Sequence, residues 1–267
     1  VGPAAGRASQ DIGVSQTSAP IGSSLQRNAA GVWASGGRTF GACNGDTPPP
    51  VPPFAIAFSG RTTGDVPLPV GFQDQIFATL LNTANGASVT TTFTWTAESP
   101  ATVSVDARGV ITALAAGQAV VRATAENGTT ATYTLPTREA VASTTAQYAN
   151  HVAFGVPQDA DPSDDFLVTY PQFVSSWSGV RNTPNWVAYN LEATHFGPED
   201  RCDCFTFDPS LPSQFARYTT ADYTGAGTVA GFGIDRGHLA RSFDRTAGAL
   251  DNARSFYFTN IIPQAAD

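Results

Sequence analysis

The sequence predicts a multidomain chain in which an all-β sandwich precedes a domain of different composition. A proline-rich run at 48–53 separates an N-terminal segment from the rest of the 267 residues. Between 54 and 137, apolar and polar residues alternate in short runs that end in turn residues. From about 138 onward, aromatic residues and asparagines become frequent, and all three histidines appear. A chain of this length can bury two or three modest cores.

The N-terminal segment, 1–47, is rich in Gly, Ala and Ser and shows little periodicity, which favours a poorly structured linker. Within it, 22–27, Trp33 and 40–44 resemble the last strands of a lamin-tail-like β domain. The run 48–53 predicts an extended, semi-rigid polyproline linker.

Residues 54–137 predict an antiparallel sandwich. Phe93 and Trp95 alternate with threonines, as expected for strands that bury one face. Turn signals follow at 106–109, Asp-Ala-Arg-Gly, and at 127–128, where Asn-Gly is typical of a hairpin. Short strands between regularly spaced turns are typical of sandwiches.

The stretch 95–124 resembles the bacterial Ig-like domain of group 2, and the resemblance covers most of 54–137. It implies a spacer or adhesive module of secreted or surface proteins. No catalytic group stands out in this part of the sequence.

The chemistry centres on one stretch, 233–242, which contains Asp235-Arg236-Gly237-His238. A histidine can accept a proton near neutral pH, and an arginine can bind a phosphate through two parallel N–H bonds. The carboxylate three residues before the histidine can orient either group. The glycine predicts a sharp turn of the backbone.

Other strings accompany this motif at a particular order and spacing: Pro184–Val187, Arg201 with Phe205 and Asp208, and Phe256–Gln264, which reads as a strand. Together they resemble the DNA/RNA non-specific endonucleases, the ββα-metal or His-Me finger nucleases, over about 140–267. The resemblance implies an α+β nuclease domain at 138–267, built on a central antiparallel sheet. It also implies Mg²⁺, or another divalent cation, as cofactor and DNA and RNA as substrates bound through phosphate contacts.

The same resemblance implies the role of each site residue. His238 is the general base that takes a proton from water. Arg236 and Arg201 contact phosphate. Asn260 orients the site through hydrogen bonds, and Asp235 supports the turn rather than binding metal.

Several other residues have structural interpretations beside functional ones. Arg201 has an alternative in an ion pair with Asp203 or Asp208. His151 and His195 lie outside any motif and are predicted to be structural. Arg241, where relatives commonly have proline, adds positive charge beside the site.

The metal ligands remain unassigned. The family holds its metal mainly through an asparagine at the start of a helix after the second strand, and this asparagine is expected beyond Asp267. A longer chain, or a second fragment supplying that helix, is therefore our expectation. The acidic run 159–165 could bind calcium but lacks regular ligand spacing, so a solvated loop is favoured.

Charge and cysteine content limit the function classes. A formal charge of −8, with 22 acidic residues and 14 arginines but no lysine, argues against binding nucleic acid by a basic tail. No run of eighteen apolar residues and no signal peptide is visible, and the start at Val1 fits a processed or trimmed protein. For Cys43, Cys202 and Cys204, a disulfide to a cysteine outside the sequence and free buried thiols both stay open.

These observations lead to one functional hypothesis and one competitor. The hypothesis is a secreted, extracellular or cell-surface nuclease that cleaves DNA and RNA without sequence or sugar preference, because phosphate contacts carry no sequence information. The competitor is a non-enzymatic surface or adhesion protein whose nuclease-like domain is incomplete.

Overall fold

The computed structural model describes residues 13–14, 23–27, 31–37, 53–60 and 66–266. By its contacts the chain divides into two compact units, Val1–Pro53 and Phe54–Asp267. Every helix in the described part of the chain is too short or too polar to cross a bilayer.

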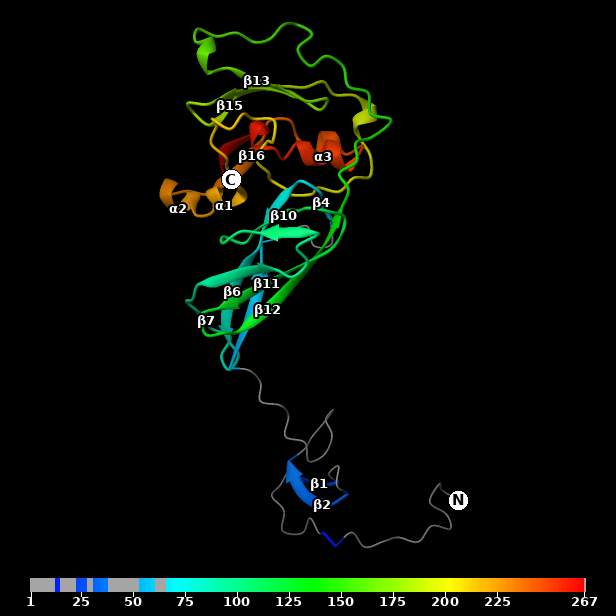
Figure 1. The fold of residues 1–267 in the computed structure, drawn as a ribbon, viewed down its shortest axis with the longest axis vertical. Coiled ribbons are helices and arrows are strands. Elements are labelled where there is room, and N and C mark those ends of the chain that lie inside the picture. The colour runs from blue at the N-terminus through cyan, green and yellow to red at the C-terminus, as the bar shows by residue number, and fades with distance from the viewer. Residues whose placement is uncertain (1–12, 15–22, 28–30, 38–52, 61–65, 267) are drawn as a thin grey trace, which may run out of the picture. The chain divides into compact units, whose positions relative to one another are not determined.

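The first unit contains a β-hairpin. Strand β1 (Ser23–Arg27) pairs antiparallel with β2 (Trp33–Gly37), as Figure 1 shows. The expectation of a poorly structured linker is therefore wrong for these two strands, which pair their backbone groups with each other. The segment 40–44 and the prolines up to 52 lie outside the described residues, and the lamin-tail-like resemblance stays a prediction.

The all-β part of the second unit consists of small sheets with the strand orders β3-β6-β7, β5-β10-β9 and β4-β12-β11-β8. All pairs are antiparallel except β12 with β4. The strands are β3 (Phe54–Ser59), β4 (Leu68–Pro69), β5 (Gln73–Gln75), β6 (Phe77–Asn82), β7 (Ser88–Val89), β8 (Phe93–Ala97), β9 (Val103–Val105), β10 (Val110–Ala113), β11 (Gly117–Ala125) and β12 (Thr130–Arg138).

Both predicted turns of this part are confirmed. Asp106 Oδ1 accepts hydrogen bonds from the backbone N–H of Arg108 and Val110, at 2.8 and 2.9 Å, and so closes the turn before β10. Gly109 has φ of 77°, and an added Cβ would lie 2.3 Å from the carbonyl oxygen of Ile76, so only glycine fits.

The C-terminal part combines an antiparallel three-stranded sheet, a two-stranded sheet and short helices. The sheets are β13 (Phe166–Thr169), β14 (Val174–Ser178) and β15 (Thr183–Ala188), in that order, and β16 (Ile234–His238) with β17 (Ile261–Ala265). The α-helices are α1 (Thr220–Tyr223), α2 (Ala226–Ala230) and α3 (Ala249–Arg254), and 3-10 helices cover Pro162–Asp164, Ala193–His195, Ser242–Arg245 and Phe258–Asn260.

The strand predicted from Phe256 begins only at Ile261. Phe256, Tyr257 and Phe258 are all buried, so their side chains cannot alternate between a core and solvent as they would along a half-buried strand. The backbone instead turns around Thr206. Thr206 N donates to Phe256 O, and Thr206 O accepts from Phe258 N, both at 3.1 Å.

The all-β part and the C-terminal part share one hydrophobic core. Phe72, 2% exposed, stacks on Tyr257 with ring centroids 5.1 Å apart, and the same buried cluster runs from Leu68 to Phe256. Helix α3 packs beside strand β4 (Figure 1). The Ig-like region is therefore packed into the domain that follows and does not form a separate spacer.

Because the core is shared, a core substitution in the all-β part should destabilise the C-terminal part as well. Phe72→Ala should lower the free energy of unfolding by about 3–5 kcal/mol, because it removes a ring from a close-packed core. Urea unfolding followed by tryptophan fluorescence should show one transition at lower urea. Phe77→Ala, at a site 38% exposed, is the matched control and should change stability by less than about 1 kcal/mol. Two separate transitions in the Phe72 variant would contradict a shared core.

Candidate active site

Four of the five predicted site residues line one cleft of about 410 Å³. They are Arg201, Asp235, Arg236 and His238, whereas Asn260 does not line it. The remaining lining residues are Gly60, Asp74, Asp203, Phe205, Gly237 and Gln264.

Strand β16 brings the central motif to this cleft. Residues two apart on a strand share a face, so Arg236 and His238 point the same way, with buried Gly237 between them and exposed Asp235 before Arg236. The predicted turn at Gly237 is wrong, because the residue pairs with Ile262 within the β16–β17 ladder and its φ is not positive.

The strand is crowded at Gly237. An added Cβ would lie 2.5 Å from Gln264 Oε1 and 3.3 Å from the carbonyl oxygen of Ile262. Asp235 consequently has no turn to support, and its role stays a prediction.

His238 is a largely buried, neutral imidazole. Its ring packs edge to face on Phe205 and Phe256, with centroids 5.4 and 4.6 Å apart. Burial, with help from the nearby guanidinium of Arg201, lowers the pKa of His238 to about 3. Nε2 is buried and has no hydrogen-bond partner among the described residues, so it can serve as a proton acceptor.

Arg236 is held by an aromatic face and one hydroxyl. Its guanidinium carbon lies 3.9 Å from the centroid of the Phe205 ring, and Nη1 donates to Thr220 Oγ1 at 3.2 Å. Burial lowers the pKa of Arg236, while the carboxylates of Asp203 and Asp74 act against this shift.

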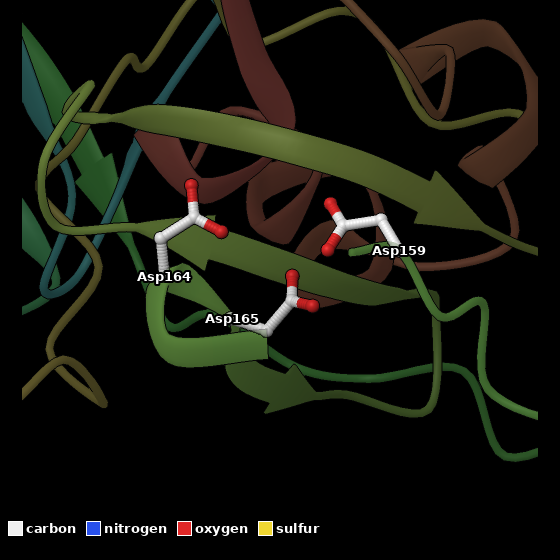
Figure 2. Close-up of side chains that lie close together, drawn as sticks. All are labelled: Asp159, Asp164 and Asp165. Carbon is white, nitrogen blue, oxygen red and sulfur yellow. The ribbon is translucent and has the colours of Figure 1, made fainter. Parts of the chain in front are cut away.

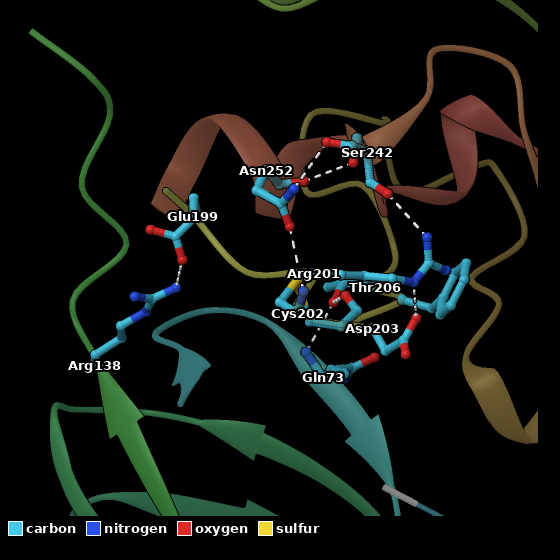
Figure 3. The surroundings of a disulfide bond; sticks show 12 residues. Gln73, Arg138, Glu199, Arg201, Cys202, Asp203, Thr206, Ser242 and Asn252 are labelled. Carbon is cyan, nitrogen blue, oxygen red and sulfur yellow. Dashed lines mark hydrogen bonds and ion pairs between the residues drawn. A yellow bond between two sulfur atoms is a disulfide. The ribbon is translucent and has the colours of Figure 1, made fainter. Parts of the chain in front are cut away.

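Arg201 lies at the rim, with half of its side chain exposed. Nε donates to Asp203 Oδ1 at 2.6 Å, and Nη1 donates to Ser242 Oγ at 2.9 Å (Figure 3). The ion pair with Asp203 considered above is therefore present. Asp208 is not its partner, since that buried carboxylate accepts from Tyr170 instead.

Asn260 acts behind the cleft. Its amide is fully buried; Oδ1 accepts from Ala240 N at 2.7 Å, and Nδ2 donates to Ala240 O and Ser255 O at 2.8 and 2.7 Å. The predicted orienting role agrees with this geometry, because these bonds fix the chain two residues after His238.

The DNA/RNA non-specific endonuclease family matches residues 147–267, and the bacterial Ig-like domain of group 2 matches residues 71–134. The C-terminal part is a DNA/RNA non-specific endonuclease domain. It follows an Ig-like domain, so both resemblances and the predicted fold class are confirmed.

Curated relatives match less than half of this chain. A nuclease of Nostoc sp. (strain PCC 7120) is 37% identical over 121 residues, which is 44% of this chain and 42% of that protein. The mitochondrial nuclease EXOG of Danio rerio is 34% identical over 113 residues, 42% of this chain and 30% of that protein. The chain thus spans less than half the length of these curated relatives.

One solved structure that matches is a 282-residue fragment of intimin in complex with the intimin-binding domain of its receptor. The match covers 52% of this chain and 62% of the fragment. Its TM-score is 0.26 and its identity 19%, values at which the likeness does not bear on the fold.

In the endonuclease domain, Cys202 and Cys204 form a disulfide (Figure 3). Both alternatives considered for these two cysteines, a distant partner and free thiols, are therefore wrong. The single residue between them, Asp203, has φ of 47°, a left-handed conformation that spacing alone does not reveal. Asn252 of α3 accepts a hydrogen bond from Cys202 N at 3.3 Å and so ties this loop to the domain. Cys43 lies outside the described residues.

The acidic run brings three carboxylates together, as Figure 2 shows. Ligand atoms of Asp159, Asp164 and Asp165 lie within 4.8 Å of one another. Arg181 Nη2 donates to Asp164 at 2.6 Å, and Asn185 Nδ2 donates to Asp165 at 3.0 Å. These protein partners account for two of the three carboxylates without an ion, and none of the three lines the cleft.

The other two histidines are engaged elsewhere. His195 is fully buried and stacks on Tyr148, with centroids 4.6 Å apart. His151 Nε2 lies 2.6 Å from the carbonyl oxygen of Pro171. Neither lines the cleft, in agreement with their predicted structural roles.

Sequence reasoning missed the Ig-like side of the cleft. Asp74 of β5 and Gly60 line it because Gln73 N donates to Thr206 Oγ1 at 2.8 Å, across the shared core (Figure 3). No local pattern around Asp74 signals this role, which depends on how the two domains pack.

The low pKa of buried His238 predicts that stability depends on pH. An unfolded histidine has a pKa near 6.5, so it binds a proton below that pH, whereas folded His238 stays neutral down to about pH 3. Stability should therefore fall as pH drops below 6.5, by about 2 kcal/mol at pH 5 from this residue. Urea unfolding at pH 7 and 5 should show this loss in the wild type and a smaller loss in His238→Gln. An NMR titration midpoint near 6.5 for His238 would contradict the buried, neutral ring.

Proposed function

We propose that this chain hydrolyses phosphodiester bonds in both DNA and RNA, without sequence or sugar preference. The observation that carries the proposal is a neutral histidine with an Nε2 that has no partner among the described residues, in one cleft with two arginines. Phosphodiester hydrolysis needs a base for the attacking water and positive charge for the developing anion.

His238 would take the proton from water at Nε2. An imidazole with a pKa of about 3 is a weak base; burial is the main cause of that low pKa, and Arg201 and Arg236 lower it further. A phosphate bound to these arginines offsets their field and raises the pKa of His238 toward the range useful for a general base. The site thus gains basicity when substrate enters.

Arg201 and Arg236 would bind the phosphate oxygens and stabilise the charge that develops on them. The planar guanidinium suits this task because its donors match phosphate geometry. Asn260 would hold the backbone beside His238, and the contribution of Asp235 at the rim stays open to test.

A divalent cation is implied by the family, and Mg²⁺ is our proposal for it. The described residues of the cleft offer no three acidic, histidine or cysteine ligands in mutual reach. Because no ligand set is present there, the residue roles above do not involve the metal.

We also propose that the protein works outside the cytoplasm, in secreted or surface-bound form. The Cys202–Cys204 disulfide supports this, since disulfides persist in oxidising compartments. The competing function, a non-enzymatic surface module, is the outcome if protein extended past Asp267 cleaves nothing with added Mg²⁺.

His238→Ala should lower the cleavage rate by about 10²–10⁴-fold, the usual effect of losing a general base. Plasmid nicking with Mg²⁺ and with EDTA measures both the base and the metal requirement. His151→Ala, a histidine outside the cleft, is the matched control and should cut like the wild type. Near-wild-type cleavage by the His238 variant would remove this residue from the role.

Arg201→Ala and Arg236→Ala should each weaken cleavage of DNA and RNA to a similar extent, because a phosphate contact does not distinguish the sugars. The corresponding lysine variants should recover only part of the activity, since lysine cannot bind bidentately. Parallel assays on matched DNA and RNA oligonucleotides measure this. A variant that changed base preference at unchanged total activity would refute the phosphate assignment.

A further inference from the structure

A second pocket adjoins the cleft, with a volume of about 540 Å³. Arg201 lines both, so the two pockets are neighbours at that side chain. Phe196 and Phe243 line the second pocket as an edge-to-face pair, with ring centroids 5.9 Å apart and planes at 66°.

These two rings are exposed although burial would stabilise them. Phe243 is 69% exposed and Phe196 40% exposed. Phe243 belongs to the 3-10 helix Ser242–Arg245, in which each of the other residues is buried. Burial of such a ring would stabilise the fold, so the outward position forgoes stability on a firmly held element.

The backbone that carries Phe243 is fixed on both sides. Asp244 accepts two hydrogen bonds from Arg241, both at 2.9 Å, and Arg245 donates to Gln172 O at 2.8 and 3.0 Å. The ring is therefore presented from a rigid support, as a stacking platform requires.

Both pockets contain carboxylates beside Arg201. In the second pocket these are Glu199 and Asp200, whose oxygens can accept N–H groups. Glu199 is itself paired with Arg138. Arg201 is the cation that both pockets share. The order along the surface is thus aromatic rings, then arginine, then His238.

We infer that the Phe196/Phe243 pocket is a subsite for an unpaired nucleobase, next to the phosphate bound at Arg201. This inference rests on the proposed function. Bases stack on exposed aromatic rings in single-stranded nucleic acid, whereas a duplex keeps their faces covered. The subsite therefore favours single strands and frayed ends over intact duplex.

The test measures binding of a short single-stranded oligothymidylate to the His238→Ala protein, in which cleavage is suppressed. Phe243→Ala added to this background should weaken binding about five- to a hundredfold, the range of one base stacked on an aromatic ring. Phe243→Trp should retain binding. Phe154→Ala, at a fully exposed ring outside the pocket, is the matched control and should bind as the parent does.

An abasic oligonucleotide of the same length separates base from backbone. It should bind the parent His238→Ala protein more weakly than oligothymidylate does. Adding Phe243→Ala should not weaken the binding of the abasic oligonucleotide further. Equal binding of both oligonucleotides to the parent, or no effect of Phe243→Ala, overturns the subsite.

Cleavage by proteins with intact His238 distinguishes this failure from failure of the proposed function. Normal cleavage with no effect of Phe243→Ala, and no preference for single strands, refutes the subsite and leaves the function standing. Absence of any cleavage together with Phe243-dependent binding refutes the function and supports the subsite.

Discussion

The hydrogen bonds of the buried Asn260 amide are the constraint on which the site depends. By holding both backbone groups of Ala240 and the carbonyl of Ser255, this side chain joins the end of β16 to the segment that leads into β17. The ladder between the two strands then sets His238 opposite Ile261. An amide can donate and accept at once, so no aliphatic or acidic side chain of similar size would satisfy the same backbone groups.

The Ig-like domain takes part in this arrangement beyond its shared core. Arg108, in the turn before β10, donates to Asp222 Oδ1 at 2.9 Å on α1. The neighbouring Thr220 of the same helix accepts from Arg236. An Ig-like turn is thus connected, through one short helix, to an arginine of the cleft. A module of this kind is commonly a detached spacer, but here its packing makes it one wall of the site.

Much of the fold was predictable from local pattern, and the chemistry from one motif. Alternation around Phe93 and Trp95 predicted strand β8, and the string at 235–238 predicted the residues that meet in the cleft. Gly237 was misread because glycine serves both turns and crowded strands, and only the position of Gln264 decides between them. The Cys202–Cys204 pair and the contribution of Asp74 depend on a left-handed residue and on domain packing, which no short window of sequence contains.

The hydrogen bonds between Gln73 and Thr206, and between Thr224 and Gln75, join residues 133 and 149 positions apart. Contacts so distant in sequence form late and slow the folding of a chain, because a long loop must close before they stabilise anything. Gln73 and Gln75 are synthesised long before Thr206 and Thr224. We therefore expect the complete cleft to be among the last features to assemble, so that a nascent chain would carry the Ig-like strands well before it carried a working site.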